Sequence, residues 1–138
     1  MTTFRDTDLL GSWRLLEWTL HYPARGEISR PFGAAPDGLL LYASDGWMSV
    51  FLCGAGGEPP QSRQVSYAGR WRIEGEYVVH ELQFAWRADW VGSTQRRRVT
   101  FAEGVLMLEA AETDDQGRQR VHHLRWRKQQ SEGGGEEP

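Results

Sequence analysis

The sequence predicts one all-β domain over residues 1–128, an eight-stranded antiparallel up-and-down barrel, followed by a disordered tail at residues 129–138. Apolar residues fall in short runs in which they alternate with polar residues, and glycines and prolines separate these runs. No stretch of helical length repeats its apolar residues with a period of about 3.6. Consecutive antiparallel strands leave no exposed edge when the first pairs with the last, so a closed barrel is expected.

Turn signals bound each expected strand. Residues 9–22 are rich in Leu, Trp, Thr and Tyr and form the longest strand. Asp45-Gly46 predicts a tight hairpin, because a two-residue type I′ turn needs positive φ at both central positions. Gly75, Glu103-Gly104 and residues 114–117 separate later strands. The strands are expected at residues 9–22, 39–43, 47–52, 67–73, 77–86, 95–101, 105–109 and 121–127.

Two long connections and the C-terminus interrupt this pattern. Residues 23–37 and 54–64 are rich in polar residues, Pro and Gly. We expect them to be loops that act as lids if they lie at the open end of the barrel. Residues 129–138 have nothing to bury, which predicts the disordered tail.

Charge and cysteine content exclude several classes of function. The formal net charge is −3, and the glutamates of the tail supply all of it. Residues 1–128 therefore present no global field toward nucleic acid or anionic lipid. Cys53 is the only cysteine, which excludes an internal disulfide and indicates a reducing compartment. No apolar run approaches the roughly 20 residues that cross a bilayer, and residues 1–8 hold no apolar signal core. We expect a cytoplasmic protein without nucleic-acid or membrane partners.

Several motifs carry a family resemblance. Gly11-Ser12-Trp13 resembles the lipocalin signature Gly-x-Trp, in which the tryptophan plugs the closed end of the barrel and a basic residue of the last strand, here Arg125 or Arg127, packs across it. The chain resembles the bacterial and fungal lipocalin-like domain family over residues 9–128. The further segments that carry the resemblance are Pro31-Phe32-Gly33 with Gly38, Leu40-Leu41-Tyr42, Asp45-Gly46-Trp47-Met48-Ser49-Val50, Tyr67-Ala68-Gly69-Arg70, His80, and Asp89-Trp90-Val91-Gly92-Ser93-Thr94-Gln95 with Arg97. The resemblance implies a calycin-type barrel with a ligand-sized cavity and implies no single activity.

Alternation along each strand predicts which side chains face the lumen. When the apolar positions are assigned inward, His80, Gln95 and Arg97 become polar side chains in an apolar and aromatic cavity, with Leu40 among its walls. The residues predicted to contact a ligand are Tyr42, Met48, Val50, Tyr67, Trp71, His80, Leu82, Phe84, Trp86, Trp90, Gln95 and Arg97.

Arg97 is the candidate anchor for an acidic ligand, because a buried guanidinium is costly unless an anion balances it. Its planar fork suits bidentate contact with a carboxylate. Two other interpretations stay open: a structural ion pair inside the barrel, with Glu17 as the candidate partner, and an outward position in the basic run 96–98. Glu17 itself faces the lumen by parity with Trp13, or the exterior if a bulge reverses the faces of the strand.

His80 also has two interpretations. An ordinary pKa near 6.5 suits general acid/base catalysis at neutral pH, and a hydrogen-bonded core histidine is the structural alternative. Tyr42 and Tyr67 supply either hydroxyl donors or packing, and Trp90 either forms the rim of the cavity mouth or caps the core.

No metal site or cofactor is predicted. His122 and His123 are neighbours on one strand and point to opposite faces, so one ion cannot easily use both. Haem would need an axial histidine, and nothing in the sequence singles one out. Cys53 is expected to pack as a small apolar residue.

Three classes of function remain. The first is binding of one small hydrophobic or aromatic molecule with a polar or acidic head in the lumen. The second is a cofactor-free isomerase, cyclase or decarboxylase for a conjugated molecule of natural-product type, with His80 as acid/base and with Arg97 and Gln95 holding an oxyanion. The third is an interaction module with a packed lumen. Trp18 and Trp47, on the expected external parity, would suit a homodimer face in any of the three.

Overall fold

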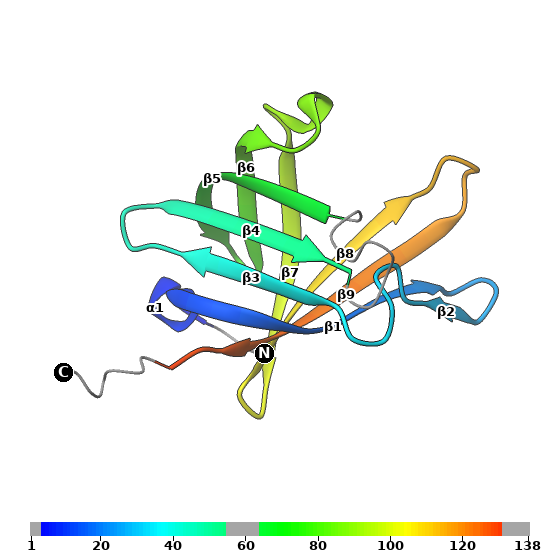
Figure 1. The fold of residues 1–138 in the computed structure, drawn as a ribbon, viewed down its shortest axis with the longest axis horizontal. Helices are drawn as coiled ribbons and strands as arrows, with labels where there is room; N and C mark the ends of the chain where they lie inside the picture. The colour runs from blue at the N-terminus through cyan, green and yellow to red at the C-terminus, as the bar shows by residue number, and fades with distance from the viewer. Residues whose placement is uncertain (1–3, 55–63, 131–138) are drawn as a thin grey trace.

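The computed structural model describes residues 4–54 and 64–130. Within them, nine antiparallel strands form one sheet in the order β2-β1-β3-β4-β5-β6-β7-β8-β9, and a further pairing of β1 with β9 closes it (Figure 1). The eight-stranded up-and-down barrel is therefore confirmed, with β2 as one additional strand. The elements are α1 (Asp6–Leu9), β1 (Gly11–Tyr22), β2 (Glu27–Ser29), β3 (Asp37–Tyr42), β4 (Trp47–Cys53), β5 (Gln64–Glu74), β6 (Tyr77–Ala85), the 3₁₀ helix η2 (Ala88–Trp90), β7 (Thr94–Ala102), β8 (Val105–Thr113) and β9 (Gln119–Lys128).

β2 lies within residues 23–37, which were expected to form a loop. It pairs with the last three residues of β1, from Leu20↔Ser29 to Tyr22↔Glu27, and so extends one wall beyond the barrel (Figure 1). All three residues of β2 are exposed, so no apolar alternation marks the strand in the sequence.

Two predicted segments fall largely outside the described residues. The lid expected at residues 54–64 includes 55–63, and the expected tail includes 131–138; both of these ranges lie outside them. Gln129 is described, and its backbone N–H donates to the Ser12 carbonyl at 2.8 Å. No helix in the described ranges is long and apolar enough to cross a membrane.

Trp13 plugs one end of the barrel, as the Gly-x-Trp resemblance implies. Its indole is buried, and Nε1 donates to the Leu9 carbonyl of α1 at 2.9 Å. The ring also contacts Phe101. The cation across the indole is Lys128, whose Nζ lies 5.0 Å from the ring centroid. The expectation of Arg125 or Arg127 is wrong, because Lys128 is the residue directly opposite Trp13 in the β1–β9 register.

A β-bulge in β1 decides which face Glu17 and Trp18 occupy. Leu15 pairs with Trp126 and Glu17 pairs with Arg125, so Leu16 is an extra residue and the alternation reverses after it. Glu17 lies outside the lumen, where its carboxylate accepts from Arg125 and Arg30 at 3.1 Å each. Trp18 faces the lumen, so its expected external position is wrong. Trp18 is therefore not available for the predicted homodimer face. Trp47 is exposed, and the homodimer stays a prediction.

A second bulge, in β6, corrects the position of Phe84. Gly69 pairs with Leu82 and Ala68 pairs with Phe84, so Gln83 is the extra residue and Phe84 points outward. Its side chain is 64% exposed. The prediction of Phe84 as a lumen wall is therefore wrong, because strict alternation does not survive the bulge.

Apolar side chains pack the half of the barrel that Trp13 closes. Leu40, Val78 and Leu106 are fully buried there, and Met48 joins the same core. Open space in the lumen consequently lies toward the opposite end, where residues of all eight barrel strands supply the walls.

Candidate ligand site in the barrel

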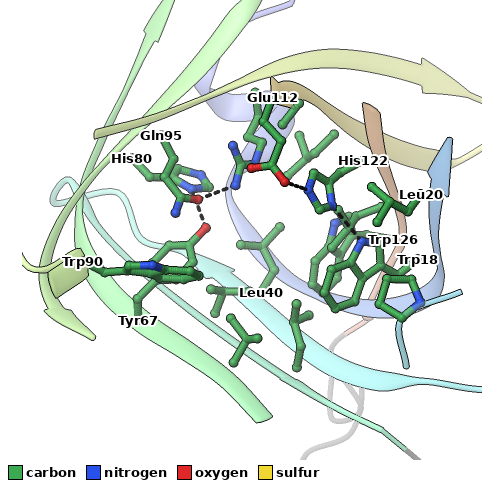
Figure 2. A pocket seen from close by; sticks show the side chains of 18 of the residues that line it. Trp18, Leu20, Leu40, Tyr67, His80, Trp90, Gln95, Glu112, His122 and Trp126 are labelled. Atoms are coloured by element: carbon green, nitrogen blue, oxygen red, sulfur yellow. Dashed lines mark hydrogen bonds and ion pairs between the residues drawn. The ribbon is translucent and has the colours of Figure 1, made fainter. Parts of the chain in front are cut away.

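The lumen contains a cavity of about 520 Å³, which lies within the usual range of about 300–1,000 Å³ for small-molecule sites. Four indoles and several aliphatic side chains line it, and two groups of polar side chains face each other across it (Figure 2). The aromatic and aliphatic lining residues include Trp18, Leu20, Leu40, Val50, Leu52, Val65, Trp86, Trp90, Leu108, Leu124 and Trp126.

The structure brings seven of the twelve predicted contact residues to this cavity. They are Val50, Tyr67, His80, Trp86, Trp90, Gln95 and Arg97. Tyr42 lies just beneath the lining, where its hydroxyl bonds His80. Met48 belongs to the packed core, Leu82 is buried outside the cavity lining, and Trp71 lines a separate hollow beside Phe4 near the closed end. Met48 and Trp71 face inward as predicted but lie too near the closed end to reach the cavity, whereas Leu82 is buried further along β6, between His80 and Trp86, without lining it.

The predictions missed a whole wall of the site. Trp18, Glu112, Arg120, His122 and Trp126 line the cavity from β1, β8 and β9. Trp18 was hidden by the bulge at Leu16. The predicted strands ended at residue 109 and began again at residue 121. Alternation therefore could not assign Glu112 or Arg120 to either face of the barrel. His122 had one usable signal, since only one of two adjacent histidines on a strand can face the lumen.

Arg97 presents a cation to the cavity without a balancing carboxylate. Its Nη2 donates to Gln95 Oε1, and within the described residues it forms no ion pair. The two other arginines of the lining differ. Arg87 binds Asp89 at 2.8 Å, and Arg120 binds Glu112 at 2.5 Å. Of the earlier interpretations, the internal ion pair with Glu17 does not form.

His80 is buried between two tyrosine hydroxyls. Its Nε2 lies 2.6 Å from the Tyr42 hydroxyl. Its Nδ1 lies 3.0 Å from the Tyr67 hydroxyl, and Figure 2 shows these two side chains side by side. Burial, and then the positive charge of Arg97, lower the pKa of His80 to about 3. The imidazole is therefore neutral at physiological pH, with one ring nitrogen donating and the other accepting.

Tyr67 lies between His80 and Arg97. Burial raises the pKa of its hydroxyl, and the neighbouring Arg97 guanidinium opposes this shift without overcoming it. Tyr67 is thus a protonated phenol at neutral pH and acts as a hydrogen-bond donor or acceptor.

The opposite wall holds a network around His122. Trp18 Nε1 donates to His122 Nδ1 at 3.1 Å, so the ring proton sits on Nε2, which donates to Glu112 at 2.8 Å (Figure 2). Burial lowers the pKa of His122, and Glu112 partly offsets this. Burial raises the pKa of Glu112, but His122 and Arg120 outweigh it and leave that pKa lowered. Glu112 is therefore a carboxylate already neutralised by Arg120.

Trp126 carries the other notable polar atom of the lining. Its indole is almost fully buried, and Nε1 has no hydrogen-bond partner within the described residues. His123, the neighbour of His122, lies on the outer face against the His21 ring at 4.4 Å. In the described ranges, no three His, Cys, Asp or Glu side chains are placed to hold a metal ion.

A closed eight-stranded barrel with one plugged end and a lined cavity is the architecture of barrels that bind small molecules. The family model of the lipocalin-like domain matches residues 10–129, so the chain belongs to the lipocalin-like domain family. No curated protein matches the chain.

Proposed function

We propose that this barrel binds one small, largely apolar or aromatic molecule through an acidic head. The observation that carries the proposal is Arg97, a half-buried cation in the lumen with no carboxylate partner in the described structure. Removing a guanidinium from bulk water is costly unless an anion compensates. A ligand carboxylate or similar oxyanion supplies that charge and matches the planar guanidinium fork.

Gln95 also favours a ligand head that accepts hydrogen bonds. Its Oε1 accepts from Arg97, which leaves the amide NH₂ as a further donor. A site made of donors favours an acceptor-rich head. The apolar remainder of the ligand would lie against Trp18, Trp86 and Trp90, which supply flat surfaces for an aromatic frame.

The environment of His80 favours binding over proton transfer. A base with a pKa of about 3, with both ring nitrogens engaged by tyrosines, is poorly matched to chemistry at neutral pH. The cofactor-free isomerase, cyclase or decarboxylase therefore stays the alternative, and a ligand that disappears with time, with a new product in the mixture, would support it.

Paired probes test the proposal. Anilinonaphthalenesulfonate and its uncharged parent, phenylnaphthylamine, share one aromatic frame and differ in the sulfonate. Titration with each should quench the indoles of the lining. Arg97→Gln should weaken the sulfonate about tenfold or more and the parent less than twofold, because a hydrogen bond to a charged group contributes about 1.5–3 kcal/mol.

Arg98→Gln is the matched control. Arg98 follows Arg97 directly on β7, but its side chain lies outside the lumen and pairs with Glu76 at 2.9 Å. Its replacement should leave both affinities unchanged. If Arg97→Gln weakens the affinity for both probes equally, or if neither probe binds the wild-type protein, the acidic-head site is contradicted.

A further inference from the structure

A hydrogen-bonded chain runs from the packed core to the cavity through Tyr42, His80 and Tyr67. Tyr42 lies at its inner end and is almost fully buried. His80 bridges the two phenols with both ring nitrogens. Tyr67, at the outer end, lines the cavity beside Arg97. Because His80 is neutral, its single ring proton gives the chain a direction.

Only two arrangements of protons satisfy both bonds of the imidazole. In the first, Tyr42 donates to Nε2 and the Nδ1–H of His80 donates to the Tyr67 oxygen. In the second, Tyr67 donates to Nδ1 and the Nε2–H of His80 donates to the Tyr42 oxygen. The two arrangements place a free phenolic proton at opposite ends of the chain.

The second arrangement leaves a buried donor without an acceptor. Tyr42 has no other hydrogen-bond partner within the described residues, and its burial keeps water away. A buried orphan donor costs about 1–3 kcal/mol, whereas an under-used acceptor oxygen is better tolerated. The first arrangement has no orphan donor, since the Tyr67 proton points to the cavity.

We propose that the chain is directed outward, so that Tyr67 donates its phenolic proton to the oxyanion of the ligand beside Arg97. This inference rests on the proposed function for the acidic head and deepens it. The head would meet two donors, one charged and one neutral. Tyr67 is then a ligand-binding residue, whereas Tyr42 and His80 are positioning residues that act through it.

The tautomer of His80 tests the direction without any ligand. Long-range ¹H–¹⁵N spectra of the labelled full chain distinguish protonated from unprotonated ring nitrogens. We expect His80 with its proton on Nδ1 and with Nε2 unprotonated. Tyr42→Phe removes the donor to Nε2, so the preference for Nδ1–H should weaken without reversing, because an Nε2–H would itself be a donor without an acceptor. A wild-type ring with the proton on Nε2 would overturn the proposal.

Binding tests the consequence. Tyr67→Phe should weaken anilinonaphthalenesulfonate about tenfold and phenylnaphthylamine less than twofold. Tyr42→Phe should weaken the sulfonate less than Tyr67→Phe does, although residue 42 does not line the cavity. Tyr77→Phe is the matched control, because Tyr77 lies at the closed end of β6 under Arg96 and faces away from the cavity. It should change neither affinity.

The outcomes separate this inference from the proposed function. If the sulfonate depends on Arg97 but Tyr67→Phe weakens both probes equally, the outward direction is wrong and the acidic-head site stands. If neither probe binds the wild-type protein, the proposed function fails, and the Nδ1 or Nε2 tautomer still decides the direction of the chain.

Discussion

Trp18 and His122, which are 104 positions apart in the sequence, form one hydrogen bond across the β1–β9 wall of the cavity. The indole N–H donates to Nδ1, so the imidazole has to keep that nitrogen unprotonated. Protonation of His122 would bring two donors face to face. The bond therefore favours the neutral ring, in addition to the effect of burial on its pKa.

Trp18→Phe should raise the pKa of His122. Loss of a neutral hydrogen bond worth about 1 kcal/mol corresponds to roughly half a unit to one unit. An NMR titration of the His122 ring measures this shift. Trp47→Phe is the control, since Trp47 lies outside the lumen beneath Arg70. An unchanged His122 pKa in Trp18→Phe would mean that the Trp18 hydrogen bond does not contribute to it.

The stability of the barrel should fall on acidification because of His80. Its folded-state pKa of about 3 lies below the unfolded value of about 6.5, so the fold favours the neutral ring. The contribution is complete above about pH 6.5 and is lost as the pH falls toward about 3, up to roughly 5 kcal/mol. Urea unfolding at several pH values measures it, and His80→Gln, which does not titrate, should show a shallower decline. Identical slopes would contradict the assignment.

The unpaired indole of Trp126 predicts an asymmetry between two buried tryptophans. Trp13 Nε1 donates to the Leu9 carbonyl, whereas Trp126 Nε1 has no partner in the described residues. Both substitutions to Phe remove similar ring volume. Trp13→Phe should therefore cost about 1 kcal/mol more free energy of unfolding than Trp126→Phe. Equal costs would show that Trp126 has an acceptor in solution.

Gly69 is required by the bulge in β6. A Cβ at this position would lie 1.8 Å from the Glu81 carbonyl oxygen and 2.8 Å from its carbon, both of which are backbone atoms. Gly69→Ala should cost about 3 kcal/mol or more. Gly75→Ala is the matched control, because nothing lies within 4 Å and only its φ of +61° is strained. It should cost about 1–2 kcal/mol, and urea unfolding compares the two.

Most of the fold followed from local patterns. Strict alternation correctly placed Val50, His80, Gln95 and Arg97 in the lumen, because the side-chain period of a strand is a property of its own backbone. The hairpin at Asp45-Gly46 was predicted correctly, but the expected two-residue type I′ turn is wrong. Gly46 has a φ of +94° and Asp45 has no positive φ, and the Ala43 N–H donates to the Trp47 carbonyl at 2.9 Å, so the loop has three residues. β2 was missed because three exposed residues contain no pattern to detect.

The sequence by itself determined the closed barrel, its plugged end at Trp13, and a lumen with a cation and a histidine. Only the tertiary structure decided that Trp18 faces inward and Phe84 outward, because each follows a bulge whose extra residue is defined by the partner strand. It also decided that Glu17 lies outside, that Arg97 has no carboxylate partner among the described residues, and that His80 is held between two phenols. These are relations between strands, and they depend on register, which alternation within one strand does not contain.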